Sequence, residues 1–153
     1  MKAKKILLSV LSIICLCFST LSITSCGNEK YTKSLKFVQH IEDASYAVVG
    51  IDKVSKDKNI VIPSVYKKLP VTEIGYEAFV TRSITSVTIP DSITHIGGGA
   101  FWGCSSLKII YYTGTKAQWN KIYIEDYYKP SSVFYHNYGY PENVTIIYDY
   151  VPE

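Results

Sequence analysis

The side chains of this chain that could do chemistry are few and widely spaced. His40, His95 and His136 stand far apart, and none belongs to the HExxH spacing of a zinc protease. Glu125 and Asp126 are adjacent, and no further acid stands at a spacing that would complete a pair for glycoside hydrolysis. We therefore predict no metal site and no enzymatic activity.

Two further motifs have a chemical and a structural interpretation. Gly97 to Gly99 lacks the Lys-Ser/Thr ending of a phosphate-binding loop and the strand-to-helix frame of a dinucleotide site, so we interpret it as a turn. There is no GxSxG nucleophile elbow. Cys104 is either a nucleophile or a buried structural thiol, and we favour the structural role. No cofactor is predicted.

The distribution of charge argues against nucleic-acid binding. The 153 residues carry a formal net charge of +3, and Lys2, Lys4 and Lys5 account for all of it. Without these three, 13 of the 16 basic residues remain and equal the 13 acidic ones. A nucleic-acid binder is expected to keep a basic surplus in its folded part, so we predict no nucleic-acid partner.

The first 25 residues have the layout of a secretory signal peptide. Met1 to Lys5 is basic, Ile6 to Phe18 is mainly apolar, and small and polar residues follow. A retained transmembrane helix is the alternative. Ile6 to Ile23 is barely long enough to span a bilayer, however, and no basic cluster follows it directly.

The sequence ITSC, which ends at Cys26, resembles a bacterial lipobox. The resemblance implies that a diacylglyceryl group joins the Cys26 sulfur and that the chain is cut after Ser25. It divides the N-terminus into a signal peptide (1–25) and a lipidated tether (26–34), with ordinary secretion as the alternative. Two acyl chains make a durable anchor. We therefore expect the chain on the extracytoplasmic face of a bacterial membrane, held by its lipid.

After the tether, the sequence predicts strands and then repeats itself. Leu35–Val38 and Ser45–Ile51 are rich in β-formers and flank a turn, so they predict a hairpin. The stretch VTEIGYEAF (71–79) then matches ITHIGGGAF (93–101), 22 positions later. Each copy is too small to bury its own apolar side, so stacked copies must share a core, as the coils of a solenoid do.

These residues resemble the BspA-like, or Treponema pallidum-type, leucine-rich repeat. Its pattern of Ile-Pro, Val-Thr-x-Ile-Gly, Ala-Phe, Cys and Leu is matched in order by residues 89–107, whereas the first copy lacks the Cys. The resemblance implies a mostly β solenoid and a surface interaction or adhesion module. Its core positions are Ile74, Phe79, Ile96, Phe101, Cys104 and Leu107.

Two recognisable copies are fewer than the usual minimum of about three, so both ends need caps. The domain is assigned to residues 35–153, with a repeat core at about 59–112, an N-terminal hairpin cap and a C-terminal cap at 113–153. Thr115 and Gln118 form a capping box, which predicts a short helix over Lys116–Lys121. Val144–Tyr148 is predicted to be a strand.

Alignment of the strands suggests where a partner would bind. Val61, Thr88 and Tyr111 should form an outward ladder, with Thr85 and Lys108 in a second ladder beside it. The expected ligand is an unidentified protein or glycan. Ten of the fourteen tyrosines lie between Tyr111 and Tyr150, and this cluster is either an end cap or an aromatic platform for sugars.

Overall fold

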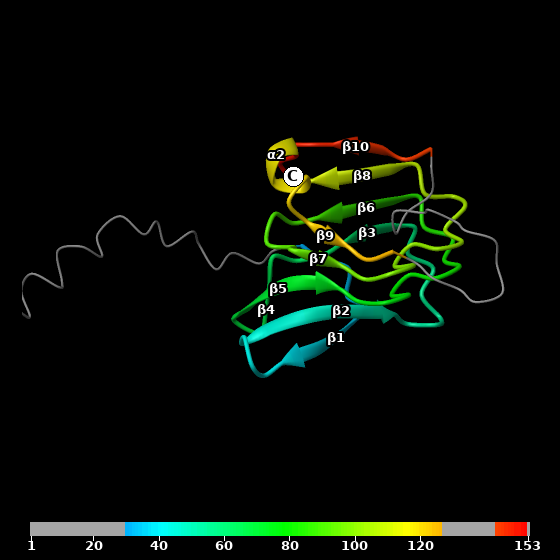
Figure 1. Ribbon diagram of the computed structural model, residues 1–153. Helices are drawn as coiled ribbons and strands as arrows, with labels where there is room; N and C mark the ends of the chain where they lie inside the picture. Colours follow the sequence, from blue (N-terminus) through cyan, green and yellow to red (C-terminus); the bar gives the residue numbers. More distant parts are fainter. Residues whose placement is uncertain (1–29, 127–142, 153) are drawn as a thin grey trace, which may run out of the picture.

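The computed structural model describes residues 30–126 and 143–152, which form a mostly β solenoid (Figure 1). The elements are β1 (Leu35–His40), β2 (Ser45–Ile51), β3 (Asn59–Val61), β4 (Val65–Tyr66), β5 (Leu69–Ile74), β6 (Ser86–Ile89), β7 (His95–Ile96), β8 (Ile109–Tyr112), α2 (Lys116–Trp119), β9 (Tyr123–Ile124) and β10 (Thr145–Ile147).

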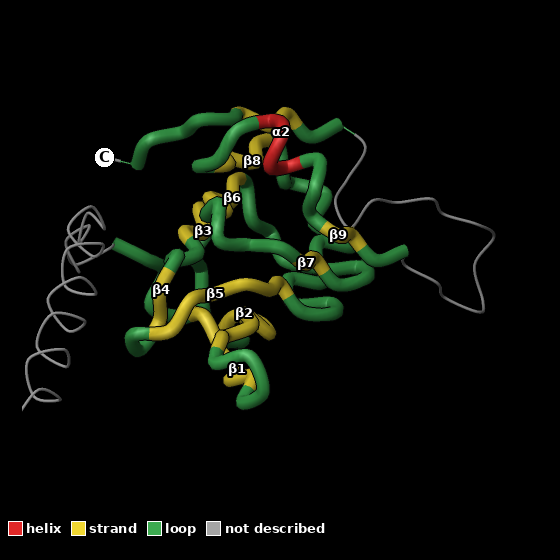
Figure 2. The backbone as a smooth tube through the Cα atoms, turned by 60° about the vertical axis from the view of Figure 1, so that its left-hand side comes forward, coloured by secondary structure: helices red, strands yellow, loops and turns green. Residues whose placement is uncertain are grey.

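The strands form two sheets on two sides of the solenoid (Figure 2). The six-stranded sheet has the order β1-β2-β5-β7-β9, with β4 paired to β5, and the four-stranded sheet has the order β10-β8-β6-β3. Strands of successive coils pair in parallel, so that Ile60, Val87 and Ile110 stand side by side. This confirms the predicted solenoid and its strand alignment.

The core repeats from coil to coil. The Phe79 and Phe101 rings are fully buried and stack with centres 5.3 Å apart and planes 5° apart, in agreement with their 22-residue spacing. Ile74 and Ile96 are also fully buried and pair in register, and Leu107 is 4% exposed. All residues of the described core lie between Leu35 and Tyr148. The described core is therefore formed by the part of the chain that follows the tether.

The turn segments between the two sheets also stack, and they require glycine for two different reasons. At Gly97 a Cβ atom would lie 2.5 Å from the Tyr76 backbone nitrogen, so the requirement is close approach. Gly99 and Gly103 instead have φ of 65° and 72°. The equivalent residues of the preceding coil, Glu77 and Thr81, hold φ of 51° and 56° without being glycine. The repeat geometry thus overrides residue preference in that coil.

A hairpin and a group of aromatic rings close the N-terminal end. β1 pairs with β2 antiparallel, and β2 continues the six-stranded sheet by pairing with β5. The rings of Phe37 and Tyr66 stack 3.9 Å apart, and Tyr31 meets both edge-on at 6.4 and 6.3 Å. Tyr46 also contacts Phe37 and Tyr66. These four residues are termed the N-terminal aromatic cluster below.

The C-terminal end is closed by α2 and β10. The capping box predicted from Thr115 and Gln118 is formed. The buried Trp119 ring contacts those of Tyr112 and Tyr148 at 5.1 and 6.4 Å. The helix ends at Trp119 and not at Lys121 as predicted, because the Lys121 and Ile122 N–H groups donate to carbonyls three residues back and turn the chain towards β9. The predicted C-terminal strand is β10, which pairs in parallel with β8.

Candidate functional site

The expected binding ladder is in register, but it is not an open surface. Val61, Thr88 and Tyr111 are aligned across β3, β6 and β8. Thr88 is only 8% exposed, however, and the other two side chains are half-buried. The three residues are therefore aligned as predicted, but the prediction that their side chains form an exposed ladder was wrong.

The ladder is partly covered because segments near both ends of the described chain pack against the four-stranded sheet. Near the N-terminus, Thr32 donates its backbone N–H to the Val61 carbonyl at 3.0 Å, and its Oγ1 accepts from the Val61 N–H at 2.8 Å. Near the C-terminus, the Tyr150 ring lies 4.5 Å from that of Tyr111. The two segments enclose a strip of the sheet between them.

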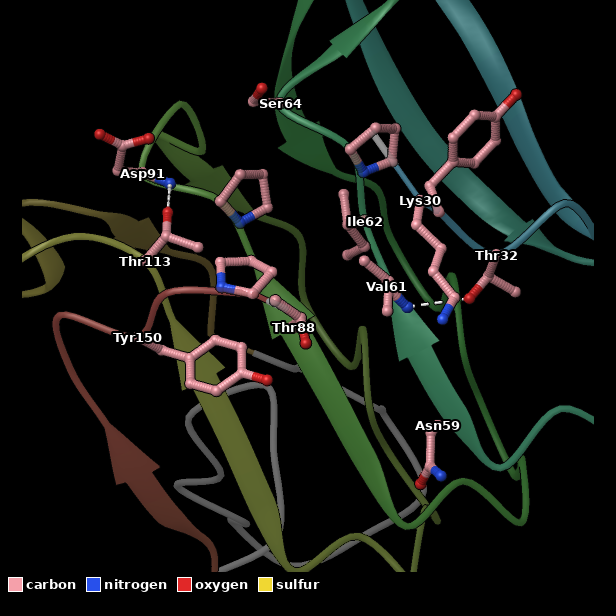
Figure 3. Close-up of a pocket in the computed structure, with 14 residues that line it drawn as sticks. Lys30, Thr32, Asn59, Val61, Ile62, Ser64, Thr88, Asp91, Thr113 and Tyr150 are labelled. Carbon is pink, nitrogen blue, oxygen red and sulfur yellow. Dashed lines mark hydrogen bonds between the residues drawn. The ribbon is translucent and has the colours of Figure 1, made fainter. Parts of the chain in front are cut away.

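This strip is the floor of a cavity of about 690 Å³, termed the terminal groove (Figure 3). One wall comes from Tyr31 and Thr32, and the other from Tyr150 and Pro152. One end of the groove is polar, where Thr113 Oγ1 accepts the Asp91 backbone N–H at 2.9 Å. The full set of lining residues is Lys30, Tyr31, Thr32, Asn59, Val61, Ile62, Pro63, Ser64, Thr88, Pro90, Asp91, Thr113, Tyr150 and Pro152.

The second predicted ladder lies outside this groove. The Thr85 hydroxyl donates to Asn59 Oδ1 at 2.8 Å, and the Thr85 backbone N–H donates to the Lys58 carbonyl. Lys108 is exposed, and its N–H donates to the Thr85 carbonyl at 3.0 Å. The structure therefore assigns the Thr85 hydroxyl to coil-to-coil contact and leaves the Lys108 side chain as an exposed charge beside the groove.

The terminal groove suits binding better than catalysis. Tyrosine rings and prolines offer apolar contact area, and threonine hydroxyls and Asp91 offer hydrogen-bonding groups. Among the described lining residues, Asp91 is the one carboxylate and Lys30 the one ammonium. A single carboxylate does not provide the acid and base pair of a glycosidase.

Cys104 has the environment of a structural thiol. It is fully buried, and its Sγ donates to the Phe79 carbonyl at 2.9 Å. Burial is the main cause that raises the pKa of the Cys104 thiol from 9.0 to about 11, and a hydrogen bond and the charge of Arg82 only partly offset it. Because the thiolate is the nucleophile, this environment opposes reactivity.

Cys104 is therefore expected to resist alkylation while the chain is folded. At pH 8, a thiol with a pKa of about 11 has roughly 100-fold less thiolate than one at 9, so iodoacetamide should label it at least that much more slowly than in urea. Mass spectrometry of the peptide that contains Cys104 measures both rates. The raised pKa also means that this thiol favours the folded state below about pH 9, an advantage lost as the pH rises towards 11. Equal labelling in buffer and urea would contradict burial.

Sequence reasoning missed a row of charged groups on the six-stranded sheet. Glu73 and His95 occupy equivalent positions of the two copies, 22 residues apart. His95 lies between Glu73 and Glu125, at 3.6 and 3.7 Å, and His40 reaches the same Glu73 carboxylate at 3.6 Å. In the described part of the chain, no three His, Cys, Asp or Glu side chains are placed to hold a metal ion. The row thus links strands of neighbouring coils. The sequence indicated only that an acid and an imidazole, Glu73 and His95, occupy the same position of the two copies.

The comparison with protein families decides what this solenoid is. The model for the family described as the BspA type leucine-rich repeat region matches residues 24–151. The chain belongs to the BspA-type leucine-rich repeat family. In this family the repeat domains are generally non-catalytic binding modules.

Solved structures similar to this BspA-type chain come from other bacteria. A leucine-rich cell surface protein from Faecalibacterium prausnitzii is 28% identical, with a TM-score of 0.45, over 54% of this chain and 23% of that one. The Treponema pallidum leucine-rich repeat protein is 26% identical, with a TM-score of 0.46, over 54% of this chain and 43% of that one. A Bacteroides ovatus leucine-rich repeat protein is 30% identical, with a TM-score of 0.47, over 54% of this chain and 23% of that one. The BspA-type chain thus spans less than half the length of these proteins. No curated protein matches it.

Two features of the BspA-type chain bear on the remaining predictions. Within residues 30–126 and 143–152, no helix is long and apolar enough to cross a bilayer. Half of the tyrosine cluster that could form an aromatic platform, including Tyr127, Tyr128 and Tyr135, falls outside the described residues. The groove walls, Tyr31 and Tyr150, lie outside the two copies recognised from the sequence, and of the two only Tyr150 was noted, as a member of the tyrosine cluster.

Proposed function

We propose that this protein is a lipid-anchored surface protein that binds another protein, without catalysis, in the terminal groove. Its family and its lipobox-like sequence support display at the cell surface. The observation that carries the binding role is the groove itself, with Val61 and Thr88 as its floor and Tyr31 and Tyr150 as its walls.

The size of the groove indicates what kind of contact it makes. At about 690 Å³ it falls within the range of roughly 300–1,000 Å³ that is usual for pockets that bind small molecules or short segments. It is too small for a standard protein interface, which buries about 800 Å² on each partner. The groove therefore suits one short extended segment of a partner. Single contacts are weak, and many copies on one membrane gain strength through avidity.

A change at the groove floor tests this proposal. Thr88→Arg places a long charged side chain where the ligand would lie, whereas Thr94→Arg makes the same change at an exposed position outside the groove. On an array of extracellular proteins, the first variant should lose at least about tenfold in affinity and the second should bind as wild type. Circular dichroism checks that both variants fold. If Thr88→Arg does not fold, Tyr150→Ala, which removes one wall, takes its place.

The opposite result would place the site elsewhere. If the Thr88→Arg and Tyr150→Ala variants bind normally and replacement of Tyr127, Tyr128 and Tyr135 abolishes binding, the partner site is the C-terminal cap.

A glycan is the second candidate ligand, favoured by one wall of the groove. The Tyr111 and Tyr150 rings lie 4.5 Å apart at 37°, close to the hydroxyl of Thr113 and the carboxylate of Asp91. An aromatic face next to hydrogen-bonding groups suits a sugar ring. A glycan array run beside the protein array distinguishes the two ligand classes, since the same Thr88→Arg variant should lose whichever ligand the groove holds.

The anchor has its own test in cells. Cys26→Ala should abolish incorporation of labelled fatty acid and leave the chain either uncleaved or released, because Cys26 is the expected acceptor. Metabolic labelling followed by fractionation measures this outcome. Wild-type protein found free in the culture supernatant, with no lipid on Cys26, would contradict the anchor.

A further inference from the structure

The N-terminal aromatic cluster carries lysines at its rim. Lys33 Nζ lies 4.1 Å from the centre of the Tyr31 ring, and Lys67 Nζ lies 5.4 Å from that of Tyr66. Lys68 follows in the exposed turn between β4 and β5, close to Val65, which is 48% exposed. Tyrosine rings beside ammonium groups and an exposed aliphatic side chain are typical of surfaces at the boundary between lipid headgroups and water.

The charge of the mature chain is divided along the sequence. Residues 27–70 contain eight lysines and five acidic residues, a net +3, whereas residues 71–153 contain five basic and eight acidic residues, a net −3. Lys36 is paired with Asp52 at 3.2 Å. In the described residues, Lys33, Lys67 and Lys68 form no ion pair with a carboxylate. The positive charge is therefore concentrated where the chain enters the fold.

The chain enters the fold close to its expected lipid. Three residues separate Cys26 from Lys30, where the described chain begins beside Tyr31. Four steps of roughly 3.5 Å reach at most about 14 Å. A diacylglyceryl group at Cys26 would thus hold the cluster within about two Debye lengths of the lipid headgroups. At this distance salt only partly screens the charge of the headgroups.

We propose that the N-terminal aromatic cluster and its rim of Lys33, Lys67 and Lys68 form a membrane-contact surface for anionic phospholipid. The proposal rests on the lipid anchor of the proposed function. The contact sets the orientation of the solenoid, because the hairpin β1–β2 and the strand β10 lie at opposite ends of it (Figure 1). The negatively charged C-terminal coils then point away from an anionic bilayer.

Binding of the unlipidated protein to vesicles tests the membrane-contact surface independently of the lipid anchor. The probe is residues 27–153, which contain the entire described core, mixed with vesicles of phosphatidylcholine alone or with half phosphatidylglycerol. Binding is expected to the anionic vesicles only and should be lost at about 0.5 M salt. The triple variant Lys33→Glu, Lys67→Glu, Lys68→Glu should have a partition coefficient onto the anionic vesicles at least about 100-fold lower than that of the wild type. This corresponds to a loss of roughly fivefold for each lysine. The matched control, Lys108→Glu, Lys116→Glu, Lys121→Glu, should change it less than about threefold.

A second measurement locates the contact. A polarity-sensitive dye on Val65→Cys should shift to the blue on anionic vesicles, whereas the same dye on Ile147→Cys, at the other end, should not; these side chains are 48% and 40% exposed. Equal binding to both vesicle types, equal loss in the two triple variants, or no binding at all would each overturn the proposal. Because the probe carries no lipid, these results are independent of the labelling test on Cys26.

Discussion

Replacement of Phe101 by alanine is expected to lower the free energy of unfolding by about 3–5 kcal/mol. The ring has no exposed surface and stacks on that of Phe79 in the preceding coil. Its removal forfeits the burial of the ring and also leaves a cavity between two coils, where neighbouring side chains are held by their own strands. Urea denaturation followed by circular dichroism measures the loss.

This loss is large for so short a solenoid. Total stabilities of small domains are about 5–15 kcal/mol, so the variant is expected to be partly unfolded at 37 °C. Tyr123→Ala is the control, because that ring is 66% exposed and its removal should cost less than about 1 kcal/mol. Similar losses in the two variants would show that the aromatic stack does not hold the coils together.

Gly97→Ala is the second change with a large expected effect, up to about 3 kcal/mol. An added Cβ would lie 2.5 Å from the Tyr76 nitrogen and 2.8 Å from the Gly75 carbonyl carbon. Both atoms belong to the backbone of the adjacent coil, so the coils themselves must separate to relieve the clash.

Gly75→Ala is the matched control at the same position of the previous copy. There the nearest atom to an added Cβ is the Val48 carbonyl oxygen at 3.4 Å, which is close to ordinary contact. We expect a change below about 1 kcal/mol, with the difference between the two variants read from their denaturation midpoints. Equal destabilisation would mean that residue preference, and not the approach of the coils, selects glycine.

The repeat made much of the fold predictable. Ile74 with Ile96 and Phe79 with Phe101 occupy equivalent positions of neighbouring coils, so one internal alignment gave both the strand register and the stacked core. Only two copies were recognised from sequence, whereas the match to the family model extends over residues 24–151 and both sheets continue into other coils beside these copies. The Ile-Gly and Ala-Phe pairs that identify a copy are absent from the others, where pairing of strands with neighbouring coils maintains the structure.

The candidate site was less predictable, because it depends on segments outside the repeat. Thr32 and Tyr150 are far apart in the sequence, and each reaches the four-stranded sheet through contacts that no periodic pattern encodes. The exposure of Thr88 was misjudged for the same reason, since an alternating strand pattern says which face a side chain takes but not what crosses that face. The alternation of side chains along the strands therefore predicted the residues of the groove floor, whereas the walls are formed by contacts between segments that are distant in the sequence.

The terminal groove shares a wall with the segment that leads to the expected anchor, and this has a mechanical consequence. A partner that pulls on the groove while the membrane holds Cys26 would load the chain between Val61 and Lys30. The force would pass through the two hydrogen bonds between Thr32 and Val61, at 3.0 and 2.8 Å, and into the tether. Load applied at Val61 would therefore be borne at the first coil, whereas load applied at Thr88 or Tyr150 would also pass through the paired strands of the later coils.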